Sequence, residues 1–243
     1  MNNSALRLFI ILLLKKTENG AASKEEVKNS LKMTAEVFEK ILANLVKEEL
    51  VNIDNDNIEI DLDKRLRLAV QAINLGATFE NISSFLTWLE FEELAAYIFE
   101  ENGYHVDRRF RFQAEGRRWE IDVLATRFPY IMCTECKHWS KTIGNSTARG
   151  IIETHLEKVE VLSRVLPGLA KRIGVHRWKN AILVPAALTM SPTPMKFYRR
   201  MPAVSILALP RFIDEFQGQL DRITHFKVDL PKWKPKPKQT KLR

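Results

Sequence analysis

A chain of 243 residues, 45% hydrophobic and 28% charged, is long enough for one sizeable core or for a small and a medium domain, and this composition excludes a disordered protein. The net charge of +8 is unevenly distributed: residues 1–65 carry ten Lys or Arg against twelve Asp or Glu, whereas residues 66–243 carry 28 against 18. We therefore expect a polyanion to bind the C-terminal part.

Three helices followed by a hairpin are predicted at the N-terminus. Apolar periodicity and polar start residues indicate helices at Ser4–Lys16, from Ser23 to about Leu31, and from Thr34 onward. Alternation on both sides of an Asn-Asp-Asn turn then indicates a hairpin of Val51–Asp54 and Ile58–Leu62. This order predicts a small winged-helix (α+β) domain at residues 1–62, a variant of the helix-turn-helix.

DNA binding and protein contact are equally compatible with this N-terminal domain. Its expected recognition helix and wing are mostly acidic, which is a poor match to phosphates. The acidic residues are Glu36, Glu39, Glu48 and Glu49 in the helix and Asp54, Asp56, Glu59 and Asp61 in the wing, against Lys40 and Lys47. The domain could thus contact DNA or a protein partner.

The remainder of the chain predicts helices alternating with strands. A connecting helix, Lys64–Leu75, ends at Gly76. The further predicted elements are a helical Phe85–Asn102, strands Tyr104–Gln113, Arg118–Thr126 and Tyr130–Lys137, a helix Ser146–Leu166 closed by Pro167-Gly168, a strand Ala181–Pro185, a helix Pro194–Arg200, a strand Val204–Ala208 and a helix Arg211–Gln217. This order is typical of an α/β protein with a mixed sheet flanked by helices.

The two cysteines and the apolar N-terminal segment bear on the cellular compartment. Cys133 and Cys136 would face opposite sides of one strand, which disfavours a disulfide and a zinc knuckle, so we expect reduced thiols and a cytoplasmic protein. Leu6–Leu14 is too short to span a bilayer and is followed by two lysines. We expect it to be a buried helix, and no membrane association.

Charged residues alternate along two of the predicted strands. Glu120 and Asp122 would share one face of the second strand, and Glu135 and Lys137 one face of the third. Burying these charges costs several kcal/mol unless they are paired or hold a metal. A metal-dependent phosphodiester site is the leading interpretation, and an ion-pair cluster on an exposed sheet face is the alternative.

The same residues carry a resemblance to a known family. The motifs are Phe91-Glu92-Glu-Leu-Ala with Asn102-Gly103-Tyr104, Trp119-Glu-Ile-Asp122-Val and Glu135-Cys-Lys137. Their order resembles the PD-(D/E)xK nuclease superfamily, most closely its Mrr-like restriction endonuclease branch, with archaeal Holliday-junction resolvases as near relatives. The resemblance covers roughly Phe85–Phe216, and it implies a restriction-endonuclease-like mixed sheet flanked by helices. The expected domains are then 1–62 (winged helix), 63–84 (connecting helix), 85–218 (nuclease) and 219–243 (basic Lys/Pro-rich tail).

The resemblance also implies roles for particular residues. Asp122 and Glu135 would bind Mg²⁺ (or Mn²⁺) through carboxylate oxygens, with the main-chain carbonyl of Cys136 as a further ligand. Lys137 would orient the attacking water or stabilise negative charge on the phosphate. Glu92, on the preceding helix, would serve a second metal or a metal-bound water.

Four further residues near these positions are either alternatives to them or have other expected roles. Glu93 is the alternative to Glu92, since adjacent helix positions point to different faces. For Glu120, contact with solvent or an arginine is favoured over metal binding. His138 and His155 are expected to be packing or hydrogen-bonding histidines.

The expected function is that of a metal-dependent endodeoxyribonuclease, in restriction or in DNA repair and recombination. DNA would be held by a group of basic residues, and relatives of the resolvase type work as homodimers. The expected DNA-binding residues are Arg108, Arg109, Arg111, Arg117 and Arg118, with Lys141 and Arg149 as weaker candidates. The alternative is a non-catalytic DNA-binding or regulatory protein that retains the nuclease fold.

Overall fold

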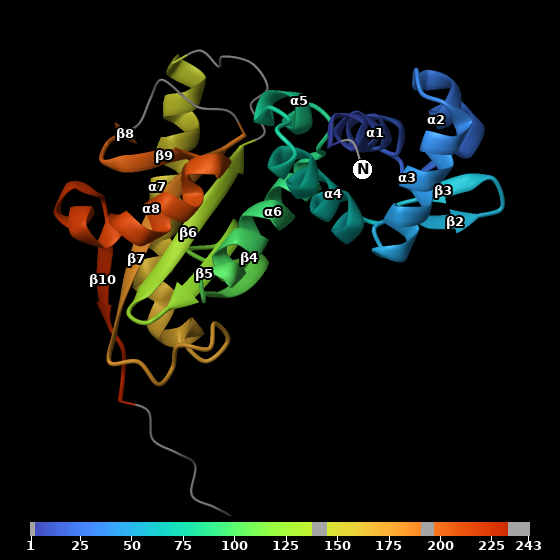
Figure 1. The fold of residues 1–243 in the computed structure, drawn as a ribbon. Helices are drawn as coiled ribbons and strands as arrows, with labels where there is room; N and C mark the ends of the chain where they lie inside the picture. The colour runs from blue at the N-terminus through green and yellow to red at the C-terminus, as the bar shows by residue number, and fades with distance from the viewer. Residues whose placement is uncertain (1–2, 138–144, 191–196, 233–243) are drawn as a thin grey trace, which may run out of the picture. The chain divides into compact units, whose positions relative to one another are not determined.

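The computed structural model describes residues 3–137, 145–190 and 197–232. Contacts within the chain divide it into two compact units, Met1–Leu94 and Ala95–Arg243. The boundary falls inside helix α6 (Trp88–Glu101), which Figure 1 shows in green. No helix in the described part of the chain is long and apolar enough to cross a membrane.

The N-terminal unit contains the expected helices and hairpin. The side chains of Ser23 and Thr34 accept hydrogen bonds from the main-chain N–H groups of Glu26 and Val37, so they cap the second and third helices as their sequence positions suggest. A short strand that was not expected, β1, joins the hairpin in an antiparallel sheet of order β1-β3-β2. The elements are α1 (Asn3–Lys16), β1 (Ala21–Ser23), α2 (Lys24–Ser30), α3 (Ala35–Lys47), β2 (Asn52–Asp54), β3 (Asn57–Glu59), α4 (Leu62–Asn74) and α5 (Phe79–Ser83).

A buried ion pair joins three helices of this unit. Arg65 of α4 pairs through Nε with Glu90 of α6, and both side chains are almost fully buried. Its Nη1 donates to the Leu14 carbonyl (3.0 Å) and to Thr17 Oγ1 (2.7 Å), both at the end of α1. Its Nη2 donates to the Phe85 carbonyl at 2.8 Å. The guanidinium thus donates four hydrogen bonds, one of them to a carboxylate, and such pairing is the condition under which a buried charge is tolerated.

The C-terminal unit is built on a curled mixed sheet. Strands β4, β5 and β6 are antiparallel neighbours, β6, β7 and β9 are parallel, and β8 pairs antiparallel with β9. One edge of β7 is shared, because its first half pairs with β10 and its last residues pair with β9. The strands are β4 (His105–Ala114), β5 (Arg117–Arg127), β6 (Tyr130–Lys137), β7 (Asn180–Thr189), β8 (Phe197–Tyr198), β9 (Met201–Ser205) and β10 (Phe226–Asp229).

Helices cover both faces of this sheet (Figure 1). The long helix α7 (Asn145–Leu169) packs its apolar side against one face, where Ile131 of β6 belongs to the same core cluster as Leu162. The neighbouring Tyr130 points to the other face, and its ring lies 5.0 Å from that of Phe216. That face is covered by α8 (Leu209–Glu215) and the 3-10 segments Ile206–Ala208 and Phe216–Arg222. The central strands are therefore buried on both sides.

Several predicted element limits were wrong. Pro167-Gly168 does not close α7, which continues to Leu169, because a proline in the last turn removes few helical hydrogen bonds. Val204–Ala208 is not one strand, since β9 ends at Ser205 and a 3-10 turn follows. The expected basic tail at 219–243 contains β10, which completes the sheet beside β7.

The helix predicted at Pro194–Arg200 is also wrong for its described residues. Phe197 and Tyr198 form β8, which returns to β9 through the two-residue turn Arg199-Arg200. Both arginines have positive φ, 49° and 60°, as the central residues of a type I′ hairpin do. Asn-Gly is the usual signal for this turn, so an Arg-Arg pair gave no warning of it.

Candidate active site

The two expected carboxylates lie where β5 separates from β6. Pairing between these strands runs from Arg127–Tyr130 to Val123–Thr134, and the next residues along are Asp122 and Glu135. Strand β6 stays paired with β7 as far as Lys137. The N–H of Cys136 instead donates to Asp122 Oδ2 at 2.7 Å, so a side chain takes the place of the departing strand.

The strand alternation breaks at this position. Ile121 and Leu124 are three residues apart, yet both belong to the core cluster that includes α7. Arg109 of β4 lies opposite Asp122 of β5, because its neighbours Arg108 and Phe110 pair with Val123 and Ile121. Arg109 has a positive φ of 49°. Strain of this kind in a non-glycine residue is often found beside functional sites. Asp122 is buried, whereas Glu120, two residues earlier on the strand, is partly exposed.

Two lysines and a histidine surround Glu135. Lys137 Nζ lies 2.7 Å from Oε1, as expected for a Glu-x-Lys pair on one strand face. Lys158 Nζ and His155 Nδ1 lie 2.6 Å and 3.2 Å from Oε2. His155 Nε2 also lies 2.8 Å from the carbonyl oxygen of Cys133. The structure thus brings together Asp122, Glu135 and Lys137.

Helix α7 supplies two residues of this site that the sequence analysis underrated. His155 was expected to be a packing or hydrogen-bonding histidine, and it is fully buried, with Nε2 beside the Cys133 carbonyl and Nδ1 3.2 Å from Glu135 Oε2. Lys158 was not considered at all. Residues three apart share a helix face, so His155 and Lys158 approach the sheet together. The spacing His-x-x-Lys on the helix after the third strand is the signal that could have found them.

The electrostatics of the two carboxylates differ. Burial, with the repulsion of Glu135 added, raises the pKa of Asp122 to about 7, although Cys136, Lys158 and Lys137 oppose the shift. Burial also acts to raise the pKa of Glu135, but interactions with His155, the charge of Lys158 and the hydrogen bond from Lys137 outweigh it. The pKa of Glu135 therefore lies well below its usual range. Two carboxyl groups with pKa values pushed apart are typical of functional sites.

The donor atoms present fit a divalent cation in part. Asp122 and Glu135 offer the hard oxygen ligands that Mg²⁺ prefers, and their mutual repulsion would be relieved by a cation. The N–H and C=O of one strand residue point to the same edge, so the carbonyl of Cys136 is directed to the same side as the N–H that contacts Asp122. Within the described residues, however, no group of three or more His, Cys, Asp or Glu side chains is arranged to hold a metal.

Glu92 lies on α6 in the N-terminal unit. Its side chain is buried, and its carboxylate accepts a hydrogen bond from the indole N–H of Trp88, one turn earlier on the helix. Glu93, the alternative, is more exposed. The role of Glu92 beside Asp122 stays a prediction.

The expected DNA-binding arginines are distributed along β4 and β5, and acidic partners engage three of them. Arg108 forms two hydrogen bonds with Glu100, Arg111 pairs with Glu120, and Arg117 lies near Glu157 while its guanidinium covers the Trp119 ring. Glu120 thus contacts an arginine, as favoured. Arg109 and Arg149 are exposed on β4 and α7. Two further residues named above, His138 and Lys141, fall outside the described residues.

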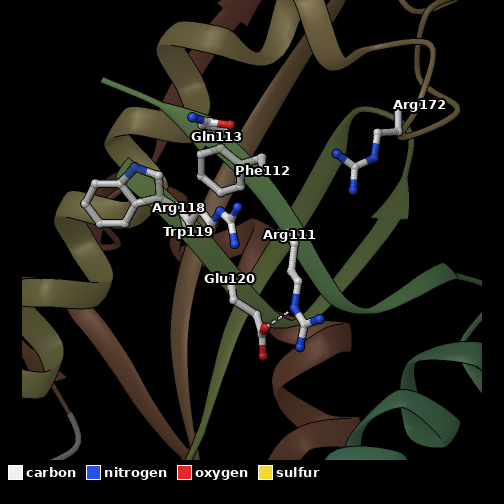
Figure 2. A pocket seen from close by; sticks show the side chains of 7 residues that line it. All are labelled: Arg111, Phe112, Gln113, Arg118, Trp119, Glu120 and Arg172. Carbon is white, nitrogen blue, oxygen red and sulfur yellow. Dashed lines mark hydrogen bonds and ion pairs between the residues drawn. The ribbon is translucent and has the colours of Figure 1, made fainter. Parts of the chain in front are cut away.

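An open hollow of about 590 Å³ lies along the β4–β5 hairpin (Figure 2). It contains three arginines, two from the hairpin and one, Arg172, from the turn after α7. Arg172 also lies over the Phe110 ring, with its guanidinium carbon 4.6 Å from the centroid. The lining residues are Arg111, Phe112, Gln113, Arg118, Trp119, Glu120 and Arg172. With three positive charges against one negative charge, the hollow suits an anion.

A family model matches the part of the chain that contains this site. Residues 84–157 match the family model Mrr_cat, described as "Restriction endonuclease". The matched segment includes Glu92, Asp122, Glu135 and Lys137, so it contains the motif residues of the PD-(D/E)xK resemblance. It spans less than a third of the 243 residues and ends one residue before Lys158.

Two solved structures are similar over most of this chain. Protein VC1899 from Vibrio cholerae is 10% identical, with a TM-score of 0.33, over 90% of this chain and 56% of that one. Can2 from Sulfobacillus thermosulfidooxidans, in complex with cyclic tetra-adenylate, is 10% identical, with a TM-score of 0.35, over 88% and 51%. The chain thus spans about half the length of these two proteins. No curated protein matches the chain.

Proposed function

We propose that the protein is a divalent-metal-dependent endonuclease that hydrolyses phosphodiester bonds in DNA. The observation that carries the proposal is the gathering of Asp122, Glu135 and Lys137 where β5 separates from β6, inside the segment that matches the restriction endonuclease family. A divalent cation bound by the two buried carboxylates would relieve their mutual repulsion. The three side chains come from adjacent strands, which hold them rigidly.

Each residue of the site has a task in hydrolysis. Asp122 and Glu135, with the Cys136 carbonyl, would hold Mg²⁺ or Mn²⁺, which when bound polarises the phosphate and makes water a better nucleophile. Lys137 contacts Glu135 Oε1, so its ammonium group is placed beside the carboxylates to orient the water or stabilise charge on the phosphate. Glu92 would assist from α6.

The hollow on the β4–β5 hairpin would hold a DNA phosphate outside the cut. Arg118 and Arg172 line it, and neither is paired with a carboxylate among the described residues. Arg111 is already paired with Glu120, so we assign it a smaller contribution. Phosphate contacts of this kind position a strand without reading its sequence.

The N-terminal unit would act as a winged helix. Its helices, short sheet and hairpin follow the order of that domain, and its acidic surface favours a protein partner over DNA. A homodimer would suit paired cuts in a duplex. Cytoplasmic location follows from the same function together with two free, buried cysteines.

A cleavage panel tests the proposal. Plasmid, branched and single-stranded DNA are incubated with the protein and Mg²⁺ or Mn²⁺, and with a chelator as the blank. We expect cleavage of at least one substrate, abolished by the chelator and reduced at least about 100-fold by Lys137→Ala, because the loss of a preorganised charge at the phosphate costs about that much. Lys227→Ala, an exposed lysine on β10 of the same sheet, is the matched control. Absence of cleavage on all three substrates would contradict the proposal.

A non-catalytic DNA-binding protein is the second candidate. The observation that favours it is the pairing of both Glu135 oxygens with lysines, which satisfies the carboxylate without a metal. It predicts DNA binding without turnover, and no divalent-metal affinity that Asp122→Ala removes. Isothermal titration with Mn²⁺, run on the wild type and on Asp122→Ala, separates the two functions.

A further inference from the structure

The Glu135 carboxylate is held from two elements. Lys137, on its own strand, contacts Oε1 at 2.7 Å, whereas Lys158 and His155 of α7 contact Oε2 at 2.6 Å and 3.2 Å. The Cys133 carbonyl, an acceptor only, lies 2.8 Å from His155 Nε2, so this nitrogen carries a hydrogen and the ring orientation is set. Through Lys158, helix α7 therefore holds one carboxylate oxygen of Glu135 while Lys137 of β6 holds the other.

The cost of this arrangement argues against a purely structural role. Lys158 is nearly buried, with 13% of its side chain exposed, and His155 is fully buried. Apolar residues in both places would pack on the sheet without desolvating a cation. The hydrogen bond that the Lys158 ammonium donates to Glu135 Oε2, by contrast, is charge-assisted and fixes the geometry of its acceptor. Near the site, α7 thus carries two polar residues beside one carboxylate, at positions where apolar side chains could pack against the sheet.

We propose that Lys158 and His155 are positioning residues for the nuclease reaction, which hold the Glu135 carboxylate in a single orientation from the α7 side. The inference rests on the proposed function, and it adds two residues that the Glu-x-Lys motif does not contain. It has a second consequence. The Lys158 ammonium interacts with the Glu135 carboxylate, to which a divalent cation would also bind, so Lys158 would orient this ligand while opposing metal binding.

Lys158→Met separates these two effects, because it keeps the length of the side chain and removes its charge. We expect Mn²⁺, measured by isothermal titration, to bind about threefold tighter or more, since a nearby positive charge has gone. We expect kcat at saturating metal to fall about 10-fold or more, as is usual when a residue that orients a metal ligand is lost. A merely structural role would lower the thermal midpoint without producing these opposite changes.

Conservative and control variants complete the test. Lys158→Arg can still donate to Glu135 and should retain most of the wild-type kcat. Arg164→Met removes an exposed cation of the same helix, one that pairs with Glu115, and should change neither metal binding nor kcat. If Lys158→Met does not fold, Lys158→Gln is measured in its place.

The outcomes distinguish this inference from the proposed function. A wild-type protein that cleaves no DNA would overturn the proposed function and the inference together. A wild-type protein that cleaves DNA while Lys158→Met keeps the wild-type kcat would overturn the inference alone. So would a Lys158→Arg variant as slow as Lys158→Met, or a variant that binds Mn²⁺ more weakly.

Discussion

At the scale of single residues, Asp122 combines burial with repulsion from a neighbouring carboxylate. Together these raise the pKa of Asp122 from 3.8 to about 7 in the metal-free protein. A group whose pKa is higher in the folded state holds its proton more tightly there. Its contribution to stability is therefore present in full below its unfolded pKa and is lost as the pH rises through about 7.

Asp122→Asn should stabilise the metal-free protein, and more so at high pH. The asparagine cannot ionise, so it avoids the cost of a buried negative charge that the wild type meets above pH 7. Thermal unfolding in a chelator should show a gain on the order of a few kcal/mol at pH 8 and a clearly smaller gain at pH 5.5. Glu120→Gln, on the same strand but partly exposed, is the control. A gain that does not depend on pH would contradict the assignment of the shift to Asp122.

At the scale of elements, β10 completes the sheet although the sequence around it suggested a tail. Its residues pair with Asn180–Leu183 of β7, and Phe226, Val228 and Leu230 pack on the core that β7 shares with α7. A strand that supplies both main-chain pairing and apolar contacts is part of the domain, even when it lies far along the sequence from the motif residues.

Removal of β10 should therefore destabilise the C-terminal unit. A chain that ends at His225 loses one buried and two partly buried apolar side chains, and each fully buried one contributes about 1.5–3 kcal/mol. Urea unfolding should show a loss on the order of a few kcal/mol relative to a chain that ends at Lys232 and keeps the strand. Equal unfolding midpoints for the two truncated chains would show that β10 adds nothing.

The sequence predicts local features of single elements, and it does not predict contacts that depend on how distant elements pack. The grouping of Asp122, Glu135 and Lys137 was predictable because strand alternation and motif spacing are local properties. Lys158 and His155 were not, because their approach to Glu135 depends on the way α7 packs across the sheet. The turn Arg199-Arg200 was missed because its conformation is unusual for its residues, and β10 because its pairing with β7 is non-local.

At the scale of the whole molecule, charge is divided between the two ends of the chain. The excess of positive charge lies beyond residue 65, in the part that contains the site and the arginine-lined hollow. Charge distributed in this way steers a polyanion to one part of a protein and makes its affinity dependent on salt.

Arg118→Ala combined with Arg172→Ala should weaken DNA binding by lowering this charge in the hollow. Each phosphate contact that is lost should reduce the slope of log affinity against log salt by about 1. Fluorescence anisotropy at several salt concentrations measures the slope, with Arg211→Ala, an exposed arginine on α8, as the control. An unchanged slope in the double variant would place the DNA elsewhere.

The two cysteines of the chain lie three residues apart on β6, both as buried free thiols. Burial raises the pKa of Cys133 as well, so this thiol is shielded from reagents and is unreactive at neutral pH. Strand β6 therefore contains two thiols whose alkylation can be followed without an introduced label. Under native conditions an alkylating reagent consumes thiol only as fast as the sheet opens around Cys133 and Cys136, and the rate of alkylation becomes a clock for that opening.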